Sequence, residues 1–306
     1  MDRLDAMSVL IAAVEEGSLS AGARRLNSPV ATVSRKVSDL EGLLGTRLLV
    51  RTSRRLELTE AGRDYIEAAR RILEQVGEAE RAAAGEYNEP RGDLVVTAAT
   101  DFGRRHLRPL ATEFLAAHPK INLRLVLGDQ SLNLVEEHVH VAIRVGHLAD
   151  SSLLASRVGW AGLVACASPA YLARRPAPRT LDELREHDGV TFRSLTPFRI
   201  WTFERDGAPL VVEPRPRLVV NDMALAVQAA LDGAGIVRAI SYNVADEIAS
   251  GALVPVLQAF APKPTPISLV HPGVGLVPLK VRAFLTWMTP RLRERLDRPL
   301  PHEAAG

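Results

Sequence analysis

The sequence predicts an α/β protein that carries an N-terminal, all-α head with a β-hairpin wing. Residues 1–58 contain closely spaced helical patterns followed by two short β-like runs. Residues 59–92 are expected to form a long helix and a hinge. From residue 93 onwards, apolar strand-like runs alternate with helical segments, an order typical of a parallel sheet with helices on both faces.

Size and composition narrow the class of protein. The chain has 306 residues, of which 47% are hydrophobic and 24% charged, so two or three globular domains are expected. Its one cysteine, Cys166, rules out an internal disulfide framework and a cysteine-rich metal site. Acidic residues interrupt the apolar positions at the N-terminus, and no apolar run approaches the roughly 20 residues that cross a bilayer. We therefore expect a cytoplasmic protein that binds no membrane.

The head opens with two helices. Apolar residues recur at helical spacing from Leu4 to Val14, and Gly17 ends this first helix. Ser18 or Ser20 can cap the second, which is expected over residues 21–26. Gly22 lies inside it, at a cost of about 1 kcal/mol relative to alanine.

A third helix has the pattern of a recognition helix. Ser28 is expected as its N-cap and Pro29 as its first residue. Val33, Val37, Leu40 and Leu44 form an apolar face, and the opposite face carries Thr32, Ser34, Arg35, Lys36 and Ser38. Major-groove readers combine an apolar docking face, a small polar and basic face, and a preceding helix that sets the angle.

Positive charge gathers around this helix and the hairpin expected over residues 47–51 and 55–58. Between Arg24 and Arg55 there are eight basic and two acidic residues, a local charge of +6 in a chain whose net charge is +2. This concentration favours contact with nucleic-acid phosphates. The alternative is a small helical domain with solvated arginines.

A long helix is expected from Thr59 to about Ala84, followed by a hinge over residues 85–92. Its apolar stripe consists of Ala61, Tyr65, Ala69, Ile72, Val76, Ala79 and Ala83. We expect dimerisation through this stripe because a single chain would leave it unburied. The alternative is a helix that only connects domains.

The head resembles the opening of LysR-type transcriptional regulators over residues 12–27, 32–49 and 51–62, without gaps. Many members carry Ser-Gln-Pro-Ala before the Val-Ser-Arg motif, whereas this chain has residues 28–32 as Ser-Pro-Val-Ala-Thr. Val30 therefore stands where many relatives have a base-reading glutamine, and contact with a thymine methyl is expected. By position, the resemblance implies DNA contacts by Ser28, Val30, Thr32, Ser34, Arg35 and Lys36, and by Arg51, Thr52 and Arg54 in the wing.

The remainder resembles the effector domain of the same family, over residues 129–137, 141–146, 150–153, 167–172 and 220–222. The resemblance implies a periplasmic-binding-protein-like effector domain over residues 93–294, with two α/β subdomains around a ligand cleft. Subdomain one is expected at 93–165 and 267–294, subdomain two at 166–266, and a flexible tail at 295–306.

Ligands of such folds sit outside the carboxyl ends of strands, near helix N-termini. The effector-binding candidates in those places are Thr100, Asp101, Phe102, Gly146, His147, Phe192, Arg193, Asp222 and Met223. Thr100 and Arg193 suit a carboxylate, which favours a carboxylated metabolite. Alternatively, Thr100 and Asp222 only cap helices and Arg193 is a surface arginine.

Together these features predict a sequence-specific regulator that binds palindromic duplex DNA as a homodimer or homotetramer under the control of a small-molecule effector. RNA polymerase is a further candidate partner. The alternatives are a solute-binding module whose head serves assembly, and an enzyme with a DNA-tethering head, although no catalytic motif supports the latter. No metal or cofactor is expected, because His138 and His140 lack a partner at zinc spacing. Cys166 is expected to be a core thiol rather than a redox switch.

Overall fold

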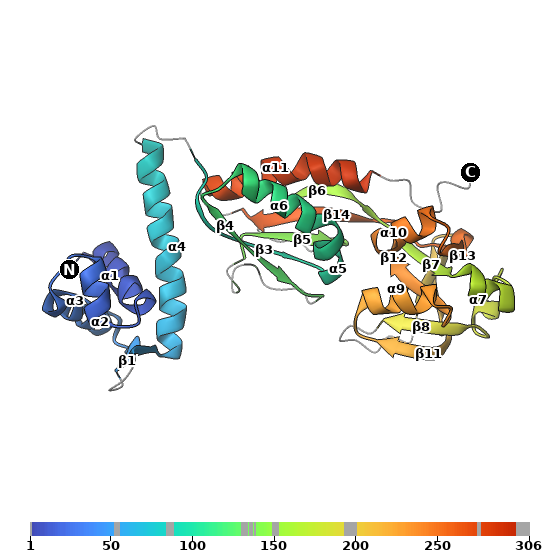
Figure 1. Cartoon of the computed structure of the whole chain (residues 1–306), viewed down its shortest axis with the longest axis horizontal. Helices are drawn as coiled ribbons and strands as arrows, with labels where there is room; N and C mark the ends of the chain where they lie inside the picture. The colour runs from blue at the N-terminus through green and yellow to red at the C-terminus, as the bar shows by residue number, and fades with distance from the viewer. Residues whose placement is uncertain are drawn as a thin grey trace. The chain divides into compact units, whose positions relative to one another are not determined.

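The protein is described by a computed structural model that covers residues 2–51, 56–83, 89–129, 134, 137, 139–148, 153–192, 201–273 and 277–297. The chain divides into two compact units, residues 1–88 and 89–306 (Figure 1). Each unit has hydrophobic cores of its own. Within the described residues, no helix is long and apolar enough to cross a membrane.

The first unit contains the expected helices and hairpin. Its elements are α1 (Arg3–Glu15), α2 (Leu19–Arg25), α3 (Val30–Leu44), β1 (Leu49–Arg51), β2 (Leu56–Leu58) and α4 (Glu60–Ala83). The Ser18 hydroxyl caps α2 by accepting a hydrogen bond from the Ala21 N–H at 3.1 Å, so this helix begins two residues earlier than expected. Strands β1 and β2 pair antiparallel, with Leu49 opposite Leu58.

The cap expected at Ser28 is wrong. Pro29 occupies the N-cap position and α3 begins at Val30. The Ser28 hydroxyl instead donates to the Leu26 carbonyl at 3.4 Å, and the Ser28 N–H donates to the Ala23 carbonyl. The turn is closed by backbone bonds at the end of α2, so the start of α3 needs no side-chain cap.

Thr59 and Gly62 fix the start of α4 to the two residues that precede β1, Arg47 and Leu48. The Thr59 hydroxyl donates to the Arg47 carbonyl at 2.8 Å and accepts from the Gly62 N–H at 2.9 Å. A Cβ on residue 62 would lie 2.0 Å from the Leu48 carbonyl oxygen, so only glycine fits there.

The apolar stripe of α4 is partly buried within one chain, contrary to expectation. Ala69 of the stripe is buried and Tyr65 packs against the core of the head, as does the neighbouring buried residue Ile66. Further along the helix, Ile72 and Ala79 are exposed. Among the described side chains, this later part of the stripe exposes the large apolar residue Ile72, which is free to contact a second copy.

The second unit begins with a five-stranded sheet in the order β4-β3-β5-β14-β6. Its strands are β3 (Gly92–Ala98), β4 (Ile121–Leu127), β5 (Val141–Val145), β6 (Leu153–Ala161) and β14 (Thr265–Pro272). The associated helices are α5 (Thr100–Phe102), the π-helix η1 (Gly103–Leu107), α6 (Arg108–Ala117) and α11 (Leu279–Leu296). Helices α6 and α11 pack against this sheet around Phe114 and Phe284, which are fully buried.

A second five-stranded sheet has the order β11-β8-β12-β7-β13. Its strands are β7 (Leu163–Ala167), β8 (Asp188–Phe192), β11 (Arg215–Val220), β12 (Ile236–Ile240) and β13 (Val254–Val256). Around it lie α7 (Pro169–Arg174), α8 (Leu181–Leu184), α9 (Met223–Leu231), α10 (Ser241–Ala249), η2 (Gln258–Phe260) and the hairpin β9 (Trp201–Arg205) and β10 (Ala208–Val212). Separate cores contain Cys166 with α9 and Trp201 with the hairpin.

The expectation of parallel sheets needs correction, because both sheets are mixed. Strand β14 runs antiparallel to β5 and β6, and β7 runs antiparallel to β12 and β13. Strand β6 and the β9–β10 hairpin were not foreseen. Since β6 and β7 are separated by Gly162 alone, no helix intervenes to signal a strand.

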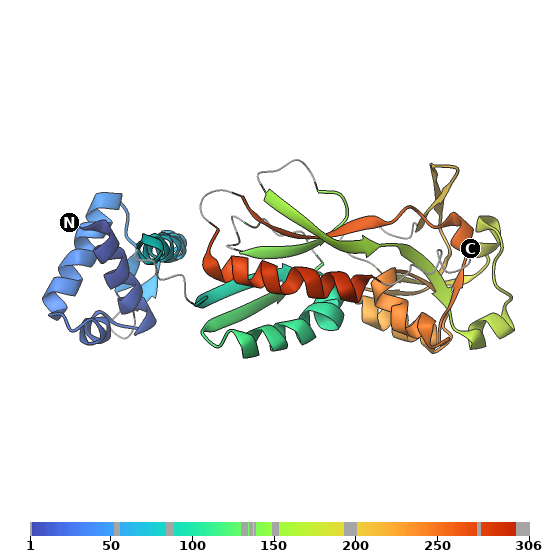
Figure 2. The ribbon, with the colours of Figure 1, turned by 90° about the horizontal axis from the view of Figure 1, so that it is seen from above.

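The chain changes sheets twice, at Gly162 between β6 and β7 and at residues 261–264 before β14 (Figure 2). The first change comes three residues before the subdomain boundary expected at residue 165. The Thr265 hydroxyl donates to the Ala161 carbonyl at 3.4 Å, so the two connections meet where they enter the first sheet. Residues 130–133, 135, 136 and 138, in and beside the segment 129–137 that resembles the family's effector domain, lie outside the described residues.

Candidate DNA interface and effector cleft

Helix α3 presents the surface expected of a recognition helix. Val33, Val37 and Leu40 are fully buried against α1 and α2. On the other side Arg35 and Ser38 are exposed, and Val30 at the N-terminal end is 46% exposed. Ser28, Thr32 and Ser34 are partly exposed. The exposed side chains of the first two turns are therefore those that a groove-bound helix would turn towards base edges.

Among the described basic residues of this stretch, two have acidic partners that lie outside it. Lys36 forms an ion pair with Asp5 of α1 at 2.5 Å, and Arg25 pairs with Glu15 at 2.7 Å. Glu15 also accepts from Arg70 of α4 at 3.0 Å. These pairs tie α1, α2, α3 and α4 together. A phosphate contact by Lys36 would have to replace Asp5.

The wing is held by Glu41, an acid that sequence reasoning counted only as a negative charge. Its Oε1 accepts hydrogen bonds from the Leu48 N–H at 2.8 Å and the Leu49 N–H at 3.0 Å. This fixes the start of β1 to the end of α3. Of the predicted wing contacts, Arg51 is the last residue of β1, whereas Thr52 and Arg54 lie outside the described residues.

In the second unit, Thr100 and Asp101 follow β3 as expected. The Thr100 N–H donates to the Asp129 carboxylate at 3.2 Å, so this helix start is already occupied by an acid that follows β4. Asp101 is 7% exposed, and its burial raises its pKa while neighbouring Arg104 partly offsets this. A ligand carboxylate at this position would meet two negative groups.

Two arginines link the first sheet's helices to the second sheet's helices. Arg104 lies 3.5 Å from Asp101 and 3.7 Å from Asp222, at the start of α9. Arg105 binds Glu247 of α10 at 2.7 Å. Helices that follow strands of different sheets thus meet at one place, which defines the candidate cleft. Sequence reasoning missed both arginines because Asp222 and Glu247, their partners on the second sheet's helices, lie more than a hundred residues away.

Phe102 belongs to the core rather than to an open cleft wall. It is fully buried, and its ring lies edge-on to Tyr242 with centroids 5.3 Å apart and tilted to His106 at 5.1 Å. Burial raises the pKa of Tyr242, as do Asp101 and Asp129. Tyr242 follows β12 closely, so the strand-end rule applied to that strand would have found it.

The other candidates lie at the same edges of the two sheets. Gly146 follows β5, has φ +111°, and donates its N–H to the Pro266 carbonyl. His147 beside it is exposed. Phe192, at the end of β8, pairs with Val220 and is partly buried. Arg193 lies outside the described residues.

Asp222 is the N-cap of α9, because its Oδ1 accepts from the Leu225 N–H at 2.8 Å. Met223 begins α9 and packs against the core beneath that helix. The alternative that Asp222 only caps a helix therefore explains the role of its Oδ1. Its second carboxylate oxygen lies 3.7 Å from Arg104. Cys166 is fully buried, and burial raises its pKa to about 12, so the thiol stays protonated at neutral pH.

Comparison with known proteins matches these two units. Residues 4–63 match the family described as bacterial regulatory helix-turn-helix protein, lysR family, and residues 87–293 match the LysR substrate binding domain. The chain is 34% identical to an HTH-type transcriptional repressor of Pseudomonas aeruginosa over 94% of this chain and 92% of that protein. It is 33% identical to the regulator CrgA of Neisseria meningitidis, over 95% and 97% of the two chains.

Solved structures lead to the same family. The CrgA structure aligns with a TM-score of 0.61 at 33% identity, covering 96% of this chain and 99% of that one. The full-length Vibrio cholerae virulence activator AphB aligns with a TM-score of 0.61 at 27% identity, covering 94% and 99%. These proteins are transcriptional regulators and not enzymes. The chain belongs to the LysR family of DNA-binding transcriptional regulators.

Proposed function

We propose that this regulator binds a palindromic duplex site as a homodimer, in the bacterial cytoplasm where the chromosome lies, and that a small-molecule effector bound between its two sheets alters that binding. The observation that supports DNA reading most directly is α3. Its apolar residues Val33, Val37 and Leu40 are fully buried, while its N-terminal turns expose Val30 and Arg35.

Replacing Arg35 by alanine is expected to weaken binding to the specific site by about 1–3 kcal/mol, or about 5- to 150-fold, if its guanidinium reads a base. Arg35 is exposed on α3, and no described residue forms an ion pair with it. Arg71→Ala on α4 is the control, because it removes an exposed arginine of the same unit away from α3. Fluorescence anisotropy at fixed salt concentration gives both affinities. Equal affinities of the two variants would remove Arg35 from the interface.

The dimer proposal rests on the later part of the α4 stripe. Ile72 is 39% exposed, and Val76 and Ala79 follow on the same stripe. A two-fold dimer places its recognition helices one helical turn apart, about 34–36 Å, or a multiple of it. Footprinting should therefore show two half-sites protected together. Protection of one half-site alone, at every protein concentration, would contradict the dimer.

The effector proposal rests on the contacts between α5–η1 and helices α9 and α10. Arg104 is half exposed, and its contacts with Asp101 and Asp222 are long, at 3.5 and 3.7 Å. A carboxylated metabolite is the class we propose, because its carboxylate can replace Asp222 at Arg104. That exchange would change the contacts that hold the two subdomains together. It can alter DNA binding only if the effector binds one arrangement of the subdomains more tightly than the other.

The effector class is tested by a thermal-shift screen of the full chain against organic acids, amines and neutral metabolites. A true effector should add about 2.7 kcal/mol of stability at a hundred times its dissociation constant. Each hit is then measured on Arg104→Gln, which should weaken a carboxylate at this site, and on Arg217→Gln, an exposed arginine of β11, which should not. Hits confined to amines or neutral compounds would overturn the carboxylate class while leaving an effector in place.

A further inference from the structure

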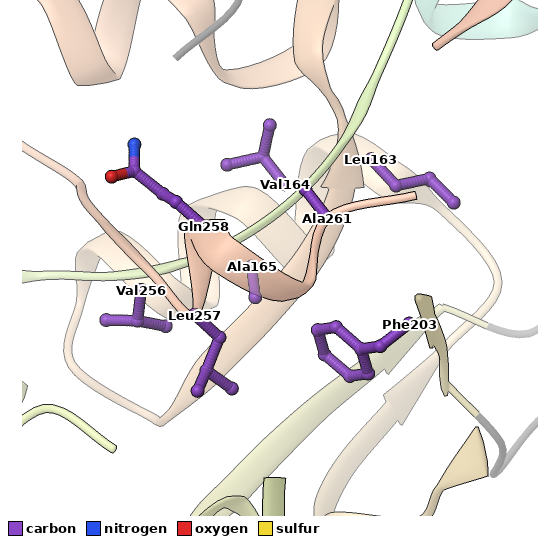
Figure 3. A pocket seen from close by; sticks show the side chains of 8 residues that line it. All are labelled: Leu163, Val164, Ala165, Phe203, Val256, Leu257, Gln258 and Ala261. Carbon is purple, nitrogen blue, oxygen red and sulfur yellow. The ribbon is translucent and has the colours of Figure 1, made fainter. Parts of the chain in front are cut away.

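The pocket between the second sheet and the β9–β10 hairpin is too small for a metabolite. Ala165, Phe203 and Leu257 are among the residues that line it (Figure 3), and its free volume of about 10 Å³ has room for about one water molecule. The surface of the DNA-binding head, in contrast, carries charged groups that can meet their ligand directly. One of these groups, the ammonium group of Lys36, is already paired with a carboxylate.

This ion pair joins the recognition helix α3 to α1. Lys36 Nζ lies 2.5 Å from Asp5 Oδ2. Lys36 directly follows Arg35 and stands one helical turn after Thr32, so it lies on the flank of the surface that is proposed to enter the groove. A lysine in this position can reach a DNA phosphate, because its ammonium group ends a flexible stem of four carbons. In the free protein Asp5 holds that group instead.

The ion pair is not needed to hold the two helices together. Its side chains are 29% and 44% exposed, and exposed pairs of this kind add little to stability. Helices α1 and α3 already share a hydrophobic core, in which Leu10, Val33 and Val37 are fully buried. The pair therefore acts mainly on the charge that Lys36 offers to a ligand, and little on the fold.

The Asp5 carboxylate has the chemistry of the ligand with which it competes. A carboxylate oxygen and a phosphate oxygen are both anionic acceptors for a lysine ammonium group. With Asp5 in place, Lys36 brings almost no net charge to DNA, and a phosphate can bind it only by separating the pair. Arg35 differs, because no described residue forms an ion pair with it. The two neighbouring cations of α3 are thus unequally available to DNA.

We propose that Asp5 is an internal competitor for the DNA phosphate at Lys36, and that it sets the strength and the salt dependence of DNA binding. The proposal rests on the use of α3 as the recognition helix. Phosphate contacts carry no sequence information, so the competition lowers affinity for every sequence alike. It leaves base reading by the other residues of α3 unchanged.

The test uses the full chain and a labelled duplex of random sequence, because the expected effect does not depend on sequence. Fluorescence anisotropy gives the affinity between about 50 and 200 mM salt. Asp5→Asn keeps the shape of a half-exposed side chain and removes its charge. It should raise affinity about three- to tenfold at the lowest salt concentration. It should also steepen the slope of log affinity against log salt concentration by about one for each bound head.

Asp39→Asn is the charge-matched control. Asp39 is an exposed acid of α3, and no described residue forms an ion pair with it, so its removal changes only the general electrostatic field of the head. Both substitutions are then combined with Lys36→Gln. In that background the gain from Asp5→Asn should disappear, because no ammonium group is left to release. A gain from Asp39→Asn should persist there.

The proposal is overturned if Asp5→Asn leaves the affinity unchanged, or if its gain persists in the Lys36→Gln background. Arg35→Ala then separates two explanations. If Arg35→Ala weakens binding to the specific site, α3 remains the recognition helix and Asp5 is only a structural partner of Lys36. If Arg35→Ala also has no effect, the assignment of α3 itself is wrong.

Discussion

Replacing Gly22 by alanine is expected to destabilise the DNA-binding head, although alanine is the better helix former by about 1 kcal/mol. Gly22 lies in α2 against α1, and a Cβ there would stand 2.7 Å from the Ala13 Cα and 2.8 Å from the Ala13 nitrogen. Both atoms belong to the backbone, so no side chain can rotate away and the two helices must separate. Overpacking of this kind typically costs about 1–3 kcal/mol or more, which exceeds the gain in propensity.

Gly42→Ala is the matched control for this variant. Gly42 also lies inside a helix of the head, α3, but a Cβ there would meet nothing within 4 Å. This substitution should stabilise the head by about 0.5–1 kcal/mol. Denaturant unfolding followed by far-UV circular dichroism, together with DNA binding, gives both results. Equal unfolding midpoints of Gly22→Ala and wild type would show that α1 and α2 can part without loss.

Gly22 shows where sequence reasoning ends. The short helix around it is visible in the local pattern, and so is the apolar face of α3, because helical periodicity is a property of neighbouring residues. From the sequence alone the glycine is only a cost to helix formation. Glycine is needed there because the packing of α1 against α2 brings the backbone of Ala13 next to residue 22. A backbone contact between two packed helices cannot be predicted from the residues next to it in the sequence.

The effector domain shows the same division. Strands that alternate with helices could be predicted, whereas β6 and the antiparallel pairing of β14 could not, because they depend on chain crossings between distant residues. Among the site residues, Thr100 and Asp222 were placed correctly at helix starts. Two contacts could be seen only in the folded structure. The Asp129 carboxylate accepts from the Thr100 N–H, and Arg104 faces Asp222.

Replacing Phe102 by alanine is expected to lower the free energy of unfolding of the second unit by about 3–5 kcal/mol. The side chain is fully buried, and its ring contacts Tyr242 edge-on at 5.3 Å and His106 at 5.1 Å. Alanine would leave a cavity and remove both aromatic contacts. Since Tyr242 belongs to α10 and Phe102 to α5, the loss also weakens the packing of one subdomain against the other.

Leu115→Ala is the control, because Leu115 is a large apolar residue of the nearby helix α6 that is 37% exposed. Its removal should cost less, since Leu115 is smaller than Phe102 and more than a third of it already faces water. Denaturant titration of the full chain, followed by tryptophan fluorescence, compares the two variants. If Phe102→Ala unfolds like the wild type but no longer responds to an effector found in the screen, Phe102 contacts the ligand directly and its role in the core is secondary. A large loss of stability instead makes Phe102 part of the support for the cleft.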